Sequence, residues 1–123
     1  MTLLAVFLGG GLGAVLRYWM TGAIYRYTGG GFPTGTLVVN IAGSFAIGLL
    51  MALFMDRFIT TPTMRIFLTV GLLGGFTTFS TFSYEAVVLM QEGSFFLFGT
   101  YAILTVIGCL LAAWLGLTVG KLV

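Results

Sequence analysis

Four long apolar stretches alternate with short polar connections along the chain. The stretches cover approximately residues 3–24, 37–55, 66–90 and 95–122. Each is close to or above the ~20 residues that an α-helix needs to cross a bilayer. The connections contain glycine, proline and charged residues, which commonly end helices. This pattern predicts an all-α membrane protein with four transmembrane helices, organised as a single domain over residues 1–123.

The composition supports this prediction. Of the 123 residues, 59% are hydrophobic and 7% are charged, whereas a soluble domain carries about 25% charged residues. So few charges could not cover a water-facing surface, and a lipid bilayer is the expected surrounding. The net charge is +2 without a basic cluster, which gives no support to nucleic-acid binding. The chain has no histidine and one cysteine, Cys109, which excludes a metal site of the His/Cys type.

The charge distribution gives little information about orientation. No basic region or cleavage pattern accompanies the first stretch, so we expect it to remain as a span. Four spans place both termini on one side of the membrane, with Arg57, Arg65 and Lys121; Arg26 and Arg17 belong to the other side. Three basic residues against two is almost no bias under the positive-inside rule. Either the chain inserts both ways or another feature decides, and two antiparallel copies would form a two-fold dimer.

The third apolar stretch contains an unusual segment at residues 71–83, which mixes glycines, hydroxyl residues and phenylalanines. Glycine weakens a helix interior by roughly 1 kcal/mol relative to alanine. A broken helix at mid-membrane depth persists only where protein or a polar cavity covers the freed backbone. We therefore predict that the third helix breaks around Gly74 to Thr77 and lines a site. The alternative is tight helix packing, since Gly71 and Gly75 form a small-xxx-small pair.

Such a break would have its own chemistry. Backbone carbonyls that lose their intrahelical partners suit a hard monovalent cation such as Na⁺. Phe76, Phe79 and Phe82 recur every three residues, and the positive edges of their rings could accommodate an anion without a fixed cation. Ser80 and Thr81 add hydroxyl donors beside the rings. The alternative is that the phenylalanine stripe is ordinary core.

Polar residues in the other spans are further candidates. Asn40 lies one helical turn after Thr36, and its amide could face a pore or join two helices. Arg17 lies in or near the end of the first span, where a charge is either functional or extends to the headgroups. Thr105 and Cys109 share a stripe of the fourth span, as mildly polar wall residues or as core.

Taken together, these segments resemble the CrcB/Fluc family of small fluoride channels. The matching segments are GGGLGAVLRY at 9–18, GTLVVN at 35–40 followed by Gly43-Ser44, and GGFTTFSTFSYE at 74–85. The resemblance implies an antiparallel, dual-topology homodimer in the inner (plasma) membrane, with two fluoride pathways and a broken third helix. It also implies a structural Na⁺ at the dimer centre, held by backbone carbonyls of both chains. The implied activity is passive export that lowers cytoplasmic fluoride.

The resemblance assigns roles residue by residue. The Na⁺ carbonyls would belong to Gly74 and Thr77. Arg17 would lie by an aqueous vestibule. The remaining fluoride-pathway residues would be Asn40, Phe79, Phe82, Ser80, Thr81 and Thr105.

Three other functions remain to be weighed. A small four-helix, proton-coupled drug exporter needs an intramembrane carboxylate, for which Glu85 is the only candidate. A non-transporting assembly subunit would use the glycine faces alone. An enzyme is not expected, because the chain has no histidine, no paired carboxylates and no nucleophile beside a base.

Overall fold

The computed structural model describes residues 1–56 and 60–123 and consists of helices and short connections. Within these described residues, four helices are long and apolar enough to cross a membrane: Thr2–Thr28, Thr34–Met55, Pro62–Gln91 and Phe95–Leu122. The prediction of an all-α fold with four candidate spans is confirmed. The fourth span has the predicted bounds, whereas the first three are longer than predicted. Their helices continue into the polar flanks, as in α1 (Thr2–Thr28), which ends where Gly29 adopts a φ of 75°.

The third span is built from several pieces. It begins with α3 (Pro62–Ile66), continues as the π-helical turn η1 (Phe67–Leu73) and the short α4 (Gly74–Phe76), and resumes as α5 (Phe79–Gln91). Thr77 and Thr78 between them are extended, with φ/ψ of −82°/158° and −152°/115°. The predicted bend is present. It lies at Thr77 and Thr78 and not at Gly74, which keeps a helical φ of −63° and ψ of −37°.

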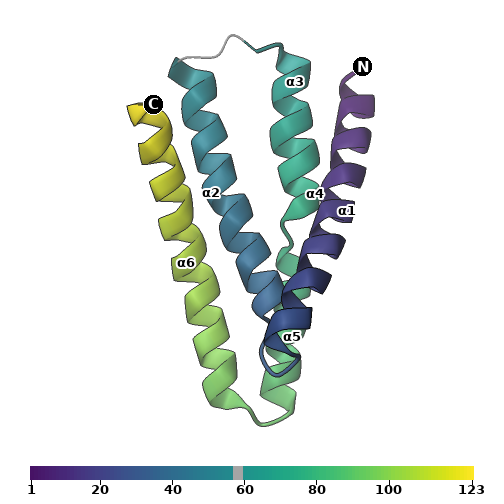
Figure 1. Cartoon of the computed structure of the whole chain (residues 1–123), viewed down its shortest axis with the longest axis vertical. Coiled ribbons are helices and arrows are strands. Elements are labelled where there is room, and N and C mark those ends of the chain that lie inside the picture. The colour runs from purple at the N-terminus through teal and green to yellow at the C-terminus, as the bar shows by residue number, and fades with distance from the viewer. Residues whose placement is uncertain (57–59) are drawn as a thin grey trace.

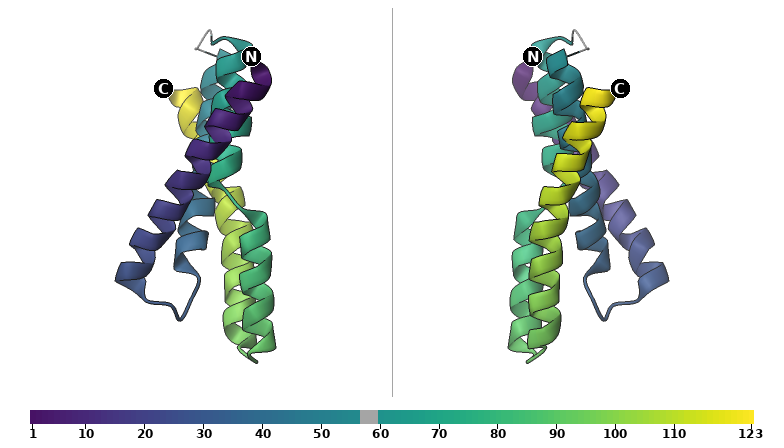
Figure 2. Two further views of the ribbon diagram at one scale, coloured as in Figure 1. Left: turned by 90° about the vertical axis from the view of Figure 1, so that its right-hand side faces the viewer. Right: turned by 90° about the vertical axis from the view of Figure 1, so that its left-hand side faces the viewer.

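Two pairs of helices make up the bundle. In the upper half of Figure 1, α1 lies along η1 and α4, while α2 (Thr34–Asp56) packs along α6 (Phe95–Leu122). Below the break, α5 lies against α6, and these two helices diverge from α1 and α2 (Figure 2). Both termini lie at the same end (Figure 1). The break therefore stands where the bundle begins to open.

Glycines allow the helices of each pair to approach closely. A Cβ atom at Gly13 of α1 would overlap the Leu72 carbonyl oxygen, and one at Gly75 would overlap that of Gly10. A Cβ atom at Gly116 of α6 would likewise overlap the Phe45 carbonyl of α2. Small residues therefore give close helix packing in α1 and α6. On the third span, Gly75 allows tight packing against α1, and the helix breaks two residues later. The two interpretations of residues 71–83, helix packing and a helix break, therefore both apply.

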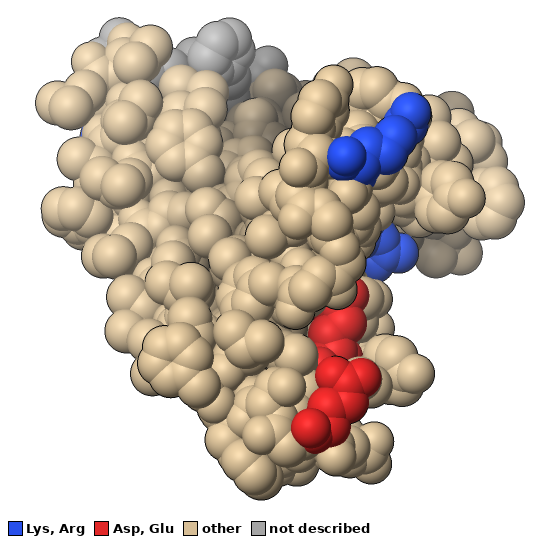
Figure 3. Space-filling view, turned by 60° about the horizontal axis from the view of Figure 1, so that its bottom comes forward, with Lys and Arg blue, Asp and Glu red and all other residues tan. Residues whose placement is uncertain are grey.

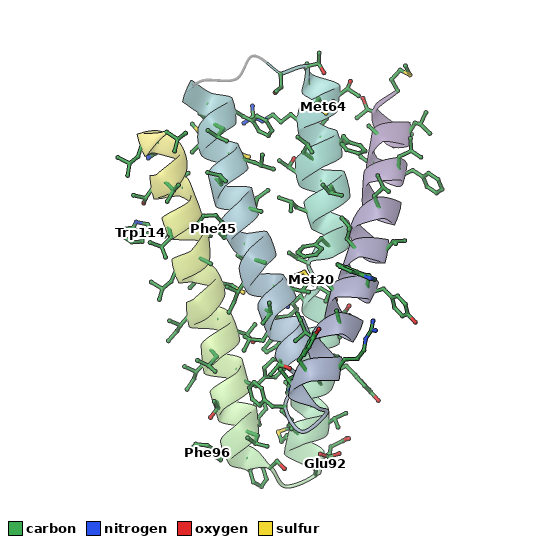
Figure 4. The ribbon with its side chains drawn as sticks, in the orientation of Figure 1. Met20, Phe45, Met64, Glu92, Phe96 and Trp114 are labelled. Atoms are coloured by element: carbon green, nitrogen blue, oxygen red, sulfur yellow. The ribbon has the colours of Figure 1, made fainter. Side chains whose placement is uncertain are left out.

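The outer surface is largely apolar, as expected of a bilayer protein. Large hydrophobic side chains are exposed along the helices, and Phe96 and Trp114 lie at the outer edge of α6 (Figure 4). The buried interior centres on Tyr101 and Val39, which are fully enclosed. At the end with the termini, the Arg65 guanidinium lies 5.6 Å from the centroid of the Phe54 ring. Arg57, which the charge count placed on this side, lies outside the described residues.

Candidate functional site

The side chain of Asn40 forms hydrogen bonds with the backbone of the helix break. Its Nδ2 donates to the Thr78 carbonyl oxygen at 2.9 Å, and the Thr78 N–H donates to its Oδ1 at 2.8 Å. This two-bond pairing is what an extended residue makes with a neighbouring strand, and here a side chain of α2 supplies it. Both residues are 7% exposed. Asn40 therefore joins two helices, and the second N–H of its amide is left for another acceptor.

The pairing leaves two backbone carbonyls without their helical donors. In a continuous helix, the Thr78 amide would donate to the Gly74 carbonyl and the Thr81 amide to the Thr77 carbonyl. Instead, the Thr78 amide donates to Asn40, and the Thr81 amide donates to the Thr78 Oγ1 atom at 3.2 Å. Two uncharged oxygens are thus freed, and such oxygens suit a hard monovalent cation. The backbone at Gly74 and Thr77 fits the Na⁺ that the sequence predicts.

Hydroxyl groups gather at the start of α5. The Thr78 Oγ1 atom caps this helix through the Thr81 amide. It also lies 3.0 Å from the Thr81 hydroxyl and 3.3 Å from the exposed Ser80 hydroxyl. The positive end of the α5 dipole points to the same place. This cluster can donate hydrogen bonds to an anion without a formal positive charge.

A cavity of about 470 Å³ lies against the break. Five predicted site residues from four helical segments and the break line it: Asn40, Gly74, Thr77, Phe79 and Thr105. Thr105 is 6% exposed, and its hydroxyl has no hydrogen-bond partner among the described residues. An unpaired buried hydroxyl costs about 1–3 kcal/mol. A partner in the cavity would remove that cost.

A second hollow, of about 250 Å³, also borders Thr78. Arg17 and Thr81 line it together with Thr36, Thr78 and Glu85. Thr78 lines both cavities, so each of them reaches the extended segment. In Figure 3, the basic and acidic side chains visible among the described residues lie along one side of this face. Half-buried Arg17 thus faces a recess rather than open lipid.

The two predicted pathway phenylalanines lie together but differ in their surroundings. The ring centroids of Phe79 and Phe82 are 5.4 Å apart at 57°. Phe79 is 76% exposed and borders the larger cavity, whereas Phe82 is 8% exposed. Phe82 packs edge-on against Tyr101, with centroids 5.0 Å apart, and lines neither of these two cavities. Within one copy of the chain, Phe82 is therefore a core residue, as the alternative interpretation of the phenylalanine stripe proposed.

Glu85 is a site residue to which the sequence analysis gave no place in the fluoride pathway. The Thr36 hydroxyl donates to its Oε1 at 2.9 Å, and the Tyr101 hydroxyl donates to its Oε2 at 2.8 Å. A carboxylate within a span needs such donors. The sequence did contain a signal for this contact, namely Thr36. It lies one turn before Asn40, and it presents a second polar group to the third span from the same face of α2.

Comparison with known proteins now bears on this site. The model of the family described as "CrcB-like protein, Camphor Resistance (CrcB)" matches residues 4–117. The chain belongs to the CrcB family. A CrcB relative from Magnetococcus marinus is 49% identical over 118 residues, 96% of each chain. Another, from Geobacter metallireducens, is 42% identical over 121 residues, 98% of each chain. A third, from Trichlorobacter lovleyi, is 47% identical over 93% of this chain and 90% of its own. All three carry the name "Fluoride-specific ion channel FluC".

Membership of the CrcB family confirms the resemblance read from the sequence. The family match and the four candidate spans identify a multi-pass membrane protein. The segments that carried the resemblance, at 9–18, 35–40 and 74–85, all fall within the matched residues. In this CrcB chain, the second and third of these segments meet at the Asn40–Thr78 pairing.

Proposed function

We propose that this CrcB protein is a fluoride-specific ion channel that lets fluoride leave the cytoplasm passively. The observation that supports the proposal is the Asn40–Thr78 pairing, because Thr78 lines both cavities and amide, hydroxyl and aromatic groups gather around it. The proposed unit is a single channel domain over residues 1–123. The named relatives are ion channels, so the protein is not an enzyme.

A neutral passage suits a small, strongly hydrated anion. Water around fluoride must be replaced by several donors, yet conduction requires binding that is weak enough for release. In the proposed pathway the donors are the second N–H of Asn40 and the hydroxyls of Ser80, Thr81 and Thr105. The ring edges of Phe79 and Phe82 join them.

Arg17 serves this pathway from the smaller cavity, where its charge attracts the anion before the passage narrows. No coupling to an energy source is needed. A negative membrane potential drives an anion outward with about 2.3 kcal/mol per 100 mV. Such a channel lowers cytoplasmic fluoride.

The channel works as an antiparallel, dual-topology homodimer with a structural Na⁺ at its centre. The Gly74 and Thr77 carbonyls would hold the ion, which would neutralise their converging dipoles. One chain offers two freed oxygens, fewer than the coordination shell of a hard cation needs, so a second copy completes the site. The 76% exposure of Phe79 within one copy also leaves a large aromatic surface for the partner to cover.

The proton-coupled drug exporter fits the geometry less well. Its required carboxylate would be Glu85, which two hydroxyl groups already hold. A carboxylate that exchanges protons with substrate must be free to lose these partners. A non-transporting assembly subunit would leave without a role the Thr105 hydroxyl, which has no partner in the described part of the chain, and the cavity beside it.

The test is fluoride efflux from proteoliposomes, followed with a fluoride electrode, with chloride efflux as the control. We expect rapid fluoride efflux, little chloride efflux and no change when a proton gradient is imposed. Equal passage of the two halides, or a leak-tight membrane, would contradict the proposal. A strong response to the proton gradient would favour the exporter.

A further inference from the structure

Gly43 of α2 touches the break at a point where no side chain fits. It is buried one helical turn after Asn40, on the same face of α2. A Cβ atom at this position would overlap the Cγ2 atom of Thr77 and lie 3.3 Å from Cδ1 of Phe76. The backbone of α2 therefore lies directly against Thr77.

Thr77 cannot move aside without losing bonds. Its hydroxyl donates to the Leu73 carbonyl oxygen at 2.9 Å, and its N–H donates to the same oxygen at 3.0 Å. The next residue, Thr78, is paired on both its N–H and its carbonyl with Asn40. Rotation of the Thr77 side chain would break the hydroxyl bond. A methyl group at position 43 would therefore either break that bond or displace the Thr77 backbone, whose carbonyl is one of the two freed oxygens.

We propose that Gly43 is a positioning residue for the Na⁺ site. By lacking a side chain, it lets Thr77 sit where its carbonyl points in the direction required for cation binding. Asn40 and Gly43, three positions apart on α2, then act as one surface that shapes the extended segment. This inference rests on the proposed function for the identity of the cation.

Gly48, on the same helix, provides a matched control. A Cβ atom there would overlap the Ala113 carbonyl oxygen of α6, a backbone contact at least as tight as the one at Gly43. Neither Gly48 nor Ala113 lines the cavity at the break. Gly48→Ala therefore disturbs helix packing at least as strongly without touching Thr77.

The experiment measures the thermal stability of the purified protein as Na⁺ replaces N-methylglucamine, and fluoride efflux separately. A cation that binds only the folded protein raises its Tm with concentration. We expect Na⁺ to raise the Tm of the wild type. Gly43→Ala should need at least about tenfold more Na⁺ for the same rise. Gly48→Ala should lower the Tm in both salts but keep the wild-type Na⁺ dependence.

A second substitution tests the steric cause. Thr77→Ser removes the Cγ2 atom that the new methyl group would meet, while it keeps the hydroxyl and the carbonyl. In the Thr77→Ser background, Gly43→Ala should therefore shift the Na⁺ dependence much less than in the wild type. If Gly43→Ala alone cannot be purified, recovery of folded, Na⁺-responsive protein by adding Thr77→Ser supports the proposal. Failure of that double variant contradicts it.

The outcomes separate this inference from the proposed function. Identical Na⁺ dependence in Gly43→Ala, Gly48→Ala and the wild type would overturn the positioning role, even if fluoride efflux is normal. A wild-type Tm that ignores Na⁺ would overturn the cation site and this inference with it. A wild type that responds to Na⁺ but passes no fluoride would overturn the channel, while the Tm comparison would still decide the role of Gly43.

Discussion

Replacing Asn40 by aspartate separates two roles of this side chain, namely pairing with Thr78 and donating to an anion. An ionised aspartate can still accept the Thr78 N–H, but it cannot donate to the Thr78 carbonyl. One of the two hydrogen bonds is lost. A buried polar group left unpaired costs about 1–3 kcal/mol. An ionised carboxylate at this buried position adds the cost of removing a charge from water, so Asn40→Asp should reduce stability by more than that amount. Asn40→Ala leaves both the N–H and the carbonyl of Thr78 unpaired, roughly twice the cost of one unpaired group, but it buries no charge.

The expected effects on fluoride conduction differ because only aspartate adds a charge. A carboxylate beside the pathway repels an anion at 4 Å by about 4 kcal/mol at an effective dielectric constant of 20. Each 1.4 kcal/mol corresponds to a factor of ten, so efflux should fall by at least about a hundredfold. Alanine adds no charge. Asn40→Ala should therefore conduct better than Asn40→Asp when equal amounts of folded protein are compared.

The assay is electrode-measured fluoride efflux from proteoliposomes that contain equal amounts of monodisperse protein, with the Tm measured on the same preparations. Retained conduction in Asn40→Asp would show that the side chain only joins the helices. A loss of efflux that tracks the loss of stability in both variants would refute the argument from charge. Only a flux defect that is larger in Asn40→Asp than in Asn40→Ala, with equal amounts of folded protein in the liposomes, agrees with a pathway role.

Three further predictions concern neighbouring groups. Phe79→Ile and Phe82→Ile should each depress fluoride efflux, whereas Phe96→Ile, at a ring that is 84% exposed on the outer edge of α6, should not; full efflux in both pathway variants would count against the aromatic path. Phe82→Ile alone should also lower the Tm, because only Phe82 packs in the buried cluster with Tyr101. Thr105→Val removes a buried hydroxyl without a partner among the described residues, so the Tm should stay equal or rise while efflux falls; unchanged efflux would make Thr105 a wall residue only. Replacing Na⁺ by N-methylglucamine should abolish wild-type fluoride efflux. Unchanged efflux after this exchange would contradict the proposed Na⁺ site.

Much of the fold could be predicted from residues that are close together in the chain. The four spans follow from apolar stretches long enough for a bilayer, and the ends of the helices from local signals such as Gly29 and Pro62. The bend in the third span was predictable because the mixture of residues at 71–83 serves no purpose in a lipid-facing helix. Its position at Thr77 and Thr78, rather than at the glycines, was not predictable in this way. Glycine permits a helix to break, but it does not require it to, and Gly74 remains helical.

The tertiary structure alone decided which residues act together. The residues that Asn40 and Thr36 contact are 38 and 49 positions away, and helical periodicity gives no information on pairing across such separations. Packing of α2 against the third span brought Asn40 to Thr78 and Gly43 to Thr77, and it placed Thr36 and Tyr101 around Glu85. The sequence by itself determined that a polar break had to exist inside the membrane. Only the packing of the helices decided where the backbone opens, because a buried carbonyl or amide stays free of its own helix only where a neighbouring side chain takes its place.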